Sequence, residues 1–450
     1  MPSSVRNWRI AAYAGPGMPE AMLLYCAGLV IPGYYATEVG LSTQAIGAAM
    51  VICRLFDAGI DPVIGYLSDR TALLPGGRRP WLIAGAVISS IAVAFLYTPA
   101  KGDGVVYYLG WTLCLYFGWT LAIIPYDAWG ADISNEYMQR TRIFTFRAFA
   151  YYLGSLMFLC TPFLGVSAER SFNAGVMRFN AHLIAALFLV TVPLALWFAP
   201  RGRTVSTHVV VGFWSILSNV RKNRPMLLFL LSYSISGISL GAFLALSYIF
   251  VVNYLKLPDA FPIILLSYAI ANVVSVPAWM WIIRRIGKHR AWALGVFFDA
   301  LIYPFLAPLQ PGPGSFMPAL ILITVSGFAD AVSRVASDAI VGDIVDYDEL
   351  KNGNNRAANY YALKSLVTKA NVALGGGFAF LSIGYFGYDP AAASNDSHGA
   401  FGLLLTLLFI PSALYVVSGL LMWQFPIDRR RQDIIRRRLD SRTDRASALI

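Results

Sequence analysis

The chain has 450 residues, of which 57% are hydrophobic and only 13% are charged, and its formal net charge is +11. Soluble globular proteins carry about 25% charged residues, so this composition excludes an ordinary soluble domain and indicates a membrane protein with several spans. Because Lys and Arg mark the cytoplasmic loops of such proteins, the positive charge does not predict nucleic-acid binding.

Twelve apolar segments each have close to the ~20 residues that a helix needs to cross a bilayer. In chain order they are 16–37, 43–67, 80–98, 105–131, 142–166, 180–199, 225–252, 261–283, 289–308, 316–343, 358–387 and 398–424. They predict an all-α integral membrane protein with twelve transmembrane helices in two six-helix bundles. The bundles are expected at 1–200 and 225–424, with a cytoplasmic linker at 201–224 and a basic cytoplasmic tail at 425–450.

Lys and Arg cluster in the connections that follow the even-numbered segments, whereas the other connections carry few of them. This alternation predicts that both termini lie in the cytoplasm. The two halves also share a pattern, LPGGRRPWLIAG in one and RRIGKHRAWALG in the other: a glycine, a basic cluster, an aromatic residue and a helix start of small residues. Repeated six-helix halves are typical of major-facilitator transporters.

Three charges interrupt the second apolar segment, in the stretch RLFDAGIDPVIGYLSDR, at Arg54, Asp57 and Asp61. Their spacing places them on one face of a helix. A charge at the bilayer centre costs roughly 2.5–3.5 kcal/mol, so charges there are usually functional. The two carboxylates can replace the hydration shell of a small cation or share a proton. The alternative is a structural salt-bridge cluster that holds helices together.

The connection SDRTALLPGGRRP carries Asp69, Arg78 and Arg79 next to a helix end. We expect these charges to hold helix ends together on the cytoplasmic side in one state of the protein. Ordinary topology charges are the alternative.

The acidic stretch DIVDYDELKNG places Asp343 and Asp346 in an expected loop after the tenth segment. Complementary charges at Arg140, Arg142 or Arg147 would let this loop connect the two halves on the cytoplasmic face. A solvated charged loop is the alternative.

On the tenth segment, Asp330, Arg334 and Asp338 follow one another at four-residue intervals. This spacing predicts a ladder of ion pairs along one helix face, which together with Arg54 forms a charge network. The alternative is that Arg334 or Asp330 faces a substrate.

Four blocks of sequence carry a family resemblance: RLFDAGIDPVIGYLSDRT with GRRPW, IPYDAWGADISNEYMQRTRIFTFRAF, DIVDYDELKNGNNRAANYYALKSLVTKA and FPIDRRR. In this order they resemble the glycoside–pentoside–hexuronide:cation symporters, the melibiose permease family. The resemblance covers essentially the whole chain. It implies a cation-coupled symporter of a sugar, glycoside or related small polar solute that works by alternating access, as a monomer in the cell membrane, most simply a bacterial inner membrane.

By position, the resemblance assigns the cation-binding carboxylates to Asp57 and Asp61 and a cation-site threonine to Thr120. In the sodium-using melibiose permease an asparagine precedes the second of these acids, whereas this chain has Ile60 there. The missing amide oxygen favours H⁺ over Na⁺ as the coupling ion, with Na⁺ at the same two acids as the alternative. No cofactor and no other metal is expected.

At the family's substrate-binding positions, this chain differs more from the family than it does at the cation-binding positions. The family's arginine and lysine correspond to Arg147 and Lys369, but its two sugar-binding acids align with an alanine and an isoleucine. Asp127 stands nearby between aromatic residues, which suit a sugar ring because they stack on its C–H face. The predicted substrate-binding residues are therefore Glu20, Tyr126, Asp127, Trp129, Arg147 and Lys369.

Other functions have less support in the sequence. Some relatives carry lysolipids or other amphiphiles, and the lost sugar acids permit such a cargo. A membrane sensor without transport activity would need a sizeable soluble domain, which the span pattern leaves no room for. No catalytic motif appears, and the four histidines are scattered, so we expect no enzyme.

Overall fold

The computed structural model describes residues 6–71, 77–100, 102–134, 137–200, 223–353, 357–392 and 394–447. In these ranges the regular structure consists of helices only. The predicted linker at 201–224 falls almost entirely outside the described residues.

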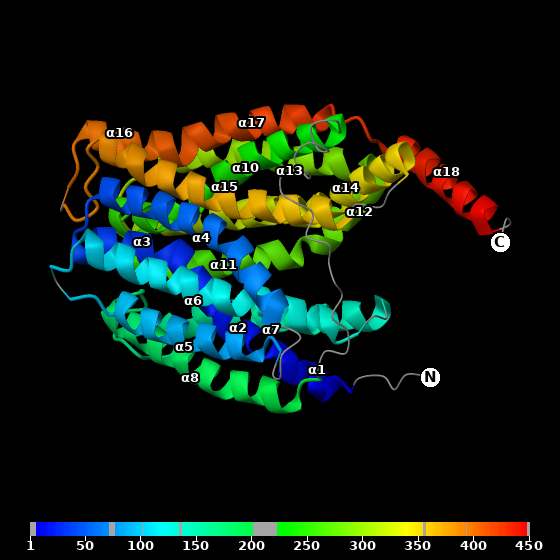
Figure 1. Ribbon diagram of the computed structural model, residues 1–450. Helices are drawn as coiled ribbons and strands as arrows, with labels where there is room; N and C mark the ends of the chain where they lie inside the picture. Colours follow the sequence, from blue (N-terminus) through cyan, green and yellow to red (C-terminus); the bar gives the residue numbers. More distant parts are fainter. Residues whose placement is uncertain are drawn as a thin grey trace. The chain divides into compact units, whose positions relative to one another are not determined.

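In the described part of the first half of the chain there are eight α-helices, which can be followed in Figure 1. They are α1 (Asn7–Ala14), α2 (Gly17–Tyr25), α3 (Ile31–Tyr34), α4 (Thr43–Thr71), α5 (Arg79–Leu96), α6 (Val105–Asp132), α7 (Tyr137–Cys160) and α8 (Ala174–Phe198). Short π-helical turns, Cys26–Val30 and Tyr35–Val39, join α2 to α3 and extend α3. The predicted span at 16–37 is therefore a chain of short helices that begins upstream of the predicted start.

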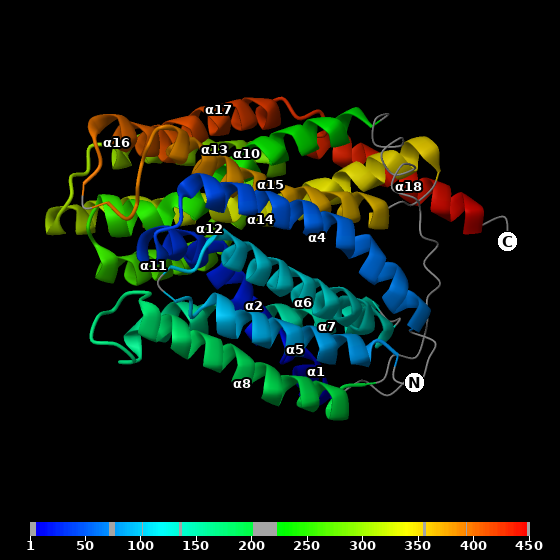
Figure 2. The same cartoon turned by 60° about the vertical axis from the view of Figure 1, so that its left-hand side comes forward.

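The second half forms the remaining α-helices (Figure 2). They are α10 (Arg224–Tyr248), α11 (Phe261–Val274), α12 (Val276–Ile286), α13 (Lys288–Ile302), α14 (Phe316–Asn352), α15 (Ala357–Tyr385), α16 (Ser397–Leu404), α17 (Ile410–Trp423) and α18 (Arg429–Ser447). The pair α11 and α12 is bent by 45°. The last helix, α18, lies in the basic tail.

The acidic stretch at 343–353 is not the predicted loop, because α14 continues to Asn352. No proline or glycine follows Gly342 within this stretch until Gly353. Gly353 has a φ of 76°, and its N–H donates to the Glu349 carbonyl at 2.8 Å, which ends the helix. Asp343 and Asp346 therefore have fixed positions on a helix surface.

Among the described residues, nine helices are long and apolar enough to cross a membrane, or ten when the bent pair α11–α12 counts as one span. The other two predicted spans are α4, which carries the three charges, and α13, which has 15 residues. All twelve predicted segments are thus helical where they are described, and most meet the length and hydropathy that a bilayer requires.

The chain divides into two compact units. Unit 1 comprises 1–208, 244–262 and 380–399, and unit 2 comprises 209–243, 263–379 and 400–450. In unit 1, α5 packs against both α6 and α8, and α2 packs against α7 (Figure 2). In unit 2, α13 packs against α14 and α17, and α18 packs against α14 (Figure 1).

Close packing of α2 on α7 requires a glycine at position 154. A Cβ atom there would lie 2.2 Å from the carbonyl oxygen of Met18, which is a backbone atom and cannot move aside cheaply. The absence of a side chain therefore lets two helices that carry site residues come into contact.

We expect Gly154→Ala to destabilise the protein by about 1–3 kcal/mol, because the added methyl group overpacks the contact between α2 and α7. Gly110→Ala is the matched control: a Cβ at Gly110 meets nothing within 4 Å, so this change should be neutral or slightly stabilising. Thermal unfolding of the purified variants measures the difference. Equal unfolding temperatures would contradict this account of the packing.

Candidate functional site

The two acids of α4 converge on one hydroxyl group of α6. The Thr120 Oγ1 atom lies 3.0 Å from Asp57 Oδ1 and 3.2 Å from Asp61 Oδ1. Asp57 and Thr120 are almost completely buried, with 1% and 0% of their surfaces exposed. The structure therefore brings together the three residues predicted as the cation site.

Arg54 supplies the positive charge of this group. Its Nη1 atom lies 3.3 Å from Asp57 Oδ2, and its guanidinium lies over the Tyr116 ring at 4.8 Å. Two carboxylates and one guanidinium leave one negative charge, and the carboxylate and hydroxyl oxygens are the ligands that hard cations prefer. The arrangement has the chemistry to accept one monovalent cation or one proton, and the Ile60 side chain has no polar atom to contribute.

A second charged cluster in unit 1 contains three predicted substrate residues from three helices. Arg147 of α7 forms a close ion pair with Asp127 of α6 through Nη1, and its Nη2 lies 3.6 Å from Oε2 of Glu20 in α2. The two acids differ sharply in environment: the side chain of Glu20 is 1% exposed and that of Asp127 is 47% exposed.

Aromatic residues surround this second cluster. The Arg147 guanidinium lies over the Tyr126 ring at 4.7 Å. Tyr13 of α1 donates a hydrogen bond to the Tyr126 carbonyl at 3.0 Å, and the Tyr126 hydroxyl donates to the Tyr13 carbonyl. Trp129 donates to the Pro200 carbonyl at 3.0 Å.

Tyr126 and Trp129 were predicted to stack on a sugar ring. In the structure they are only 1% and 5% exposed, and their polar atoms are already bonded within unit 1. This placement favours a positioning role, in which Tyr126 supports Arg147 and Trp129 lies under the Arg79 guanidinium at 5.2 Å. Asp127 and Arg147 have polar atoms better placed for a ligand.

The expected cytoplasmic charges of unit 1 converge on Arg78. Its Nη2 lies 2.7 Å from Asp69 Oδ1, as the sequence predicts for a pair that holds helix ends together, and its Nη1 is paired with Asp132 at the end of α6. Asp132 was not predicted. The side chain of Arg140 lies outside the described residues.

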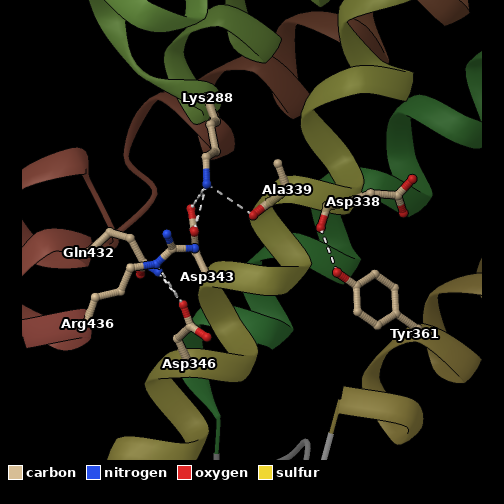
Figure 3. A network of polar contacts seen from close by, with 8 residues as sticks. All are labelled: Lys288, Asp338, Ala339, Asp343, Asp346, Tyr361, Gln432 and Arg436. Carbon is tan, nitrogen blue, oxygen red and sulfur yellow. Dashed lines mark hydrogen bonds and ion pairs between the residues drawn. The ribbon is translucent and has the colours of Figure 1, made fainter. Parts of the chain in front are cut away.

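Unit 2 has a comparable cluster, shown in Figure 3. Lys288 Nζ at the start of α13 lies 2.7 Å from both carboxylate oxygens of Asp343 and donates to the Ala339 carbonyl at 3.3 Å. Asp346, one turn further along α14, accepts hydrogen bonds from Gln432 at 2.6 Å and Arg436 at 3.3 Å, both in α18. These partners belong to unit 2, whereas the sequence prediction paired the two acids with arginines of the other half.

The two acids of the predicted charge network on α14 have partners on different helices, Asp330 on α11 and Asp338 on α15. Asp330 accepts hydrogen bonds from Tyr268 and Asn272 of α11, both at 3.1 Å, and from Arg334 at 3.4 Å. The first step of the predicted ladder, Asp330 with Arg334, is therefore present.

Asp338 is paired with Lys364 of α15, a residue that was not predicted. Lys369, the predicted substrate residue, also lies in α15 and belongs to unit 2. Both lysines lie in α15, but spacing along a single helix could not reveal that Asp338 meets Lys364.

The sequence matches a known family model, described as MFS/sugar transport protein, over residues 12–429. It is 24% identical to the glucuronide carrier protein homolog of Escherichia coli over 445 residues, 95% of each chain. It is 20% identical over 465 residues to the sodium-dependent lysophosphatidylcholine symporter 1-A of Danio rerio, covering 95% of this chain and 87% of that relative.

Solved structures show the same fold at lower identity. The nucleoside transporter NupG matches with a TM-score of 0.67 and 13% identity, covering 93% of this chain and 99% of that one. The D-xylose-proton symporter matches with a TM-score of 0.60 and 16% identity, covering 95% and 99%.

The geometry of the first cluster predicts that Thr120→Val destabilises the protein by about 1–3 kcal/mol, because the buried Asp57 and the half-buried Asp61 lose the hydroxyl group that lies between them. Thr112→Val on the same helix is the control, since the Thr112 hydroxyl is buried without a hydrogen-bond partner. Thermal unfolding of the two purified variants separates these cases. If both variants unfold at the same temperature, Thr120 does not stabilise the acid pair.

Proposed function

Since the chain belongs to the MFS/sugar transport protein family, we propose that it is a cation-coupled symporter of a sugar, glycoside or related small polar solute. The family, the symporter relatives and the fold make it a transmembrane transporter of the major facilitator superfamily and not an enzyme. We propose in addition a coupling ion, a class of substrate and the residues that bind each of them.

The observation that carries the coupling proposal is the convergence of Asp57, Asp61 and Thr120. A cation or proton that enters this group neutralises its remaining negative charge. Moving an uncompensated charge through a closed state in the membrane is costly, so only the fully loaded or the empty carrier changes conformation readily. Occupancy of the cation site and of the substrate site are thereby linked.

We propose H⁺ as the coupling ion and keep Na⁺ at Asp57 and Asp61 as the alternative. Ile60 offers no side-chain oxygen beside the second acid, which favours a proton because a carboxylate alone can bind one. The names of several relatives describe sodium-dependent symporters, which keeps the alternative in view.

For the substrate, Asp127 and Arg147 provide an acceptor and a donor that hydroxyl groups can bind, next to the buried Glu20. Lys369 remains a proposed substrate residue. The second candidate is a lysolipid or another amphiphile, favoured by the similarity to the lysophosphatidylcholine symporter along 95% of this chain.

The proposed topology has twelve spans with both termini in the cytoplasm, in a cell membrane such as a bacterial inner membrane. It rests on the loop charges and on the helices that meet the length and hydropathy criteria. On this orientation, Asp69 with Arg78 and Asp343 with Lys288 lie at the cytoplasmic ends of their helices. The proposed working form is a monomer.

We expect Asp61→Asn to abolish accumulation against a gradient in proteoliposomes, with a glucuronide and lysophosphatidylcholine as the two probes and imposed H⁺ or Na⁺ gradients. The amide is neutral and does not bind the coupling ion. Uptake should therefore stop when the probe concentrations inside and outside the vesicles are equal. Asp259→Asn, at an exposed acid between two helices, is the control and should accumulate the probe as the wild type does. Accumulation by the Asp61 variant would exclude the coupling role.

We also expect Ile60→Asn to increase the stimulation of uptake by Na⁺ at constant pH, because it restores an amide oxygen beside Asp61. Ile60→Leu is the control and should leave the ion dependence unchanged. An unaltered response to Na⁺ in the asparagine variant would show that position 60 does not select the ion.

A further inference from the structure

Glu20 occupies an unusual position for an acidic residue. Both of its carboxylate oxygens are buried without a hydrogen-bond partner among the described residues. Its cationic neighbour, Arg147, lies at 3.6 Å, beyond hydrogen-bond distance. A buried carboxylate that lacks hydrogen bonds costs several kcal/mol, unless it binds a counter-charge closely or becomes neutral.

The guanidinium of Arg147 lies closer to another acid than to Glu20. Arg147 makes its close ion pair with Asp127, the more exposed of the two acids, while it stacks on Tyr126. One guanidinium therefore stands between two carboxyl groups and lies closer to Asp127 than to Glu20, with which it makes the longer ion pair. The acid farther from the guanidinium is the one that water reaches least.

Among the residues that the structure describes, the groups around Glu20 include no cation other than Arg147. Tyr13 of α1 and Tyr126 of α6 are the other titratable groups close enough to act on it, and both are neutral hydroxyls bonded to backbone carbonyls. Helix α8 also packs on α2. The titratable residues of α8, Arg178 and His182, lie in the first half of that helix, and no ion pair joins either of them to Glu20 among the described residues.

We propose that Glu20 is a second proton-binding site, which holds a proton while Asp127 holds Arg147 and releases it when Arg147 moves to Glu20. In the release step the O–H bond of the Glu20 carboxylic acid breaks, the proton passes to water, and the new carboxylate pairs with the guanidinium. The site is separate from the acid pair of α4 and uses residues of α2, α6 and α7.

The test needs neither a substrate nor transport. Infrared spectroscopy of the purified full-length protein at neutral pH detects the carbonyl band of a protonated carboxylic acid, which a carboxylate lacks. We expect the wild-type minus Glu20→Gln difference spectrum to contain this band. Asp69→Asn, at a half-exposed acid, is the control and should leave the band unchanged.

Two further variants leave Glu20 itself intact and test the role of Arg147. In Asp127→Asn the guanidinium is free to move to Glu20, so the band should be lost. In the double variant Asp127→Asn/Arg147→Gln no guanidinium is present, so the band should return. Loss of the band in both variants would overturn control by Arg147.

Identical spectra for wild type and Glu20→Gln would overturn the proton site itself. Neither result bears on accumulation by the wild type or on the Asp61 variant. The failure of this inference is therefore distinguishable from failure of the proposed function.

Discussion

The cost of placing charge in an apolar environment governs how the helices of each unit meet. An ionised carboxylate away from water requires hydrogen-bond donors or an opposite charge. Asp57 obtains both, from Thr120 and Arg54, and this requirement fixes the rotation of α4 relative to α6. In unit 2, Asp330 obtains three donors from α11 and α14 in the same way. Apolar packing alone would not specify which face of each helix points inward, because lipid chains are as apolar as leucine.

Much of this arrangement could be read from the sequence, because it depends on periodicity. The helical segments follow from runs of apolar residues, and the shared face of Asp57 and Asp61 follows from their spacing. Partners between helices could not be read in the same way. That Arg78 meets Asp132, and that Asp338 meets Lys364, depends on the rotation and depth of two helices relative to each other. The extension of α14 could not be read from charge, because acidic residues are compatible with both a loop and a helix, and nothing in this stretch breaks a helix.

The two halves repeat one local arrangement, which explains the weak sequence similarity between them. In each, a cation just after a left-handed glycine at a helix start pairs with an aspartate near the far end of a long helix. The pairs are Arg78 with Asp132 in unit 1 and Lys288 with Asp343 in unit 2. The cations belong to the two similar sequence stretches, whereas the aspartates lie in sequences with no obvious likeness. The structure thus extends the repeat from the basic residues to their acidic partners.

These two ion pairs have a mechanical consequence. Both partners of each pair belong to one unit, so their separation need not change when one unit moves as a rigid body. In the proposed alternating access, such a contact would not have to break, and it would hold the helix ends of its own unit together during the movement. Weakening either pair should therefore soften the unit that contains it and disturb several of its helix ends together, without setting the preference between one conformation and the other.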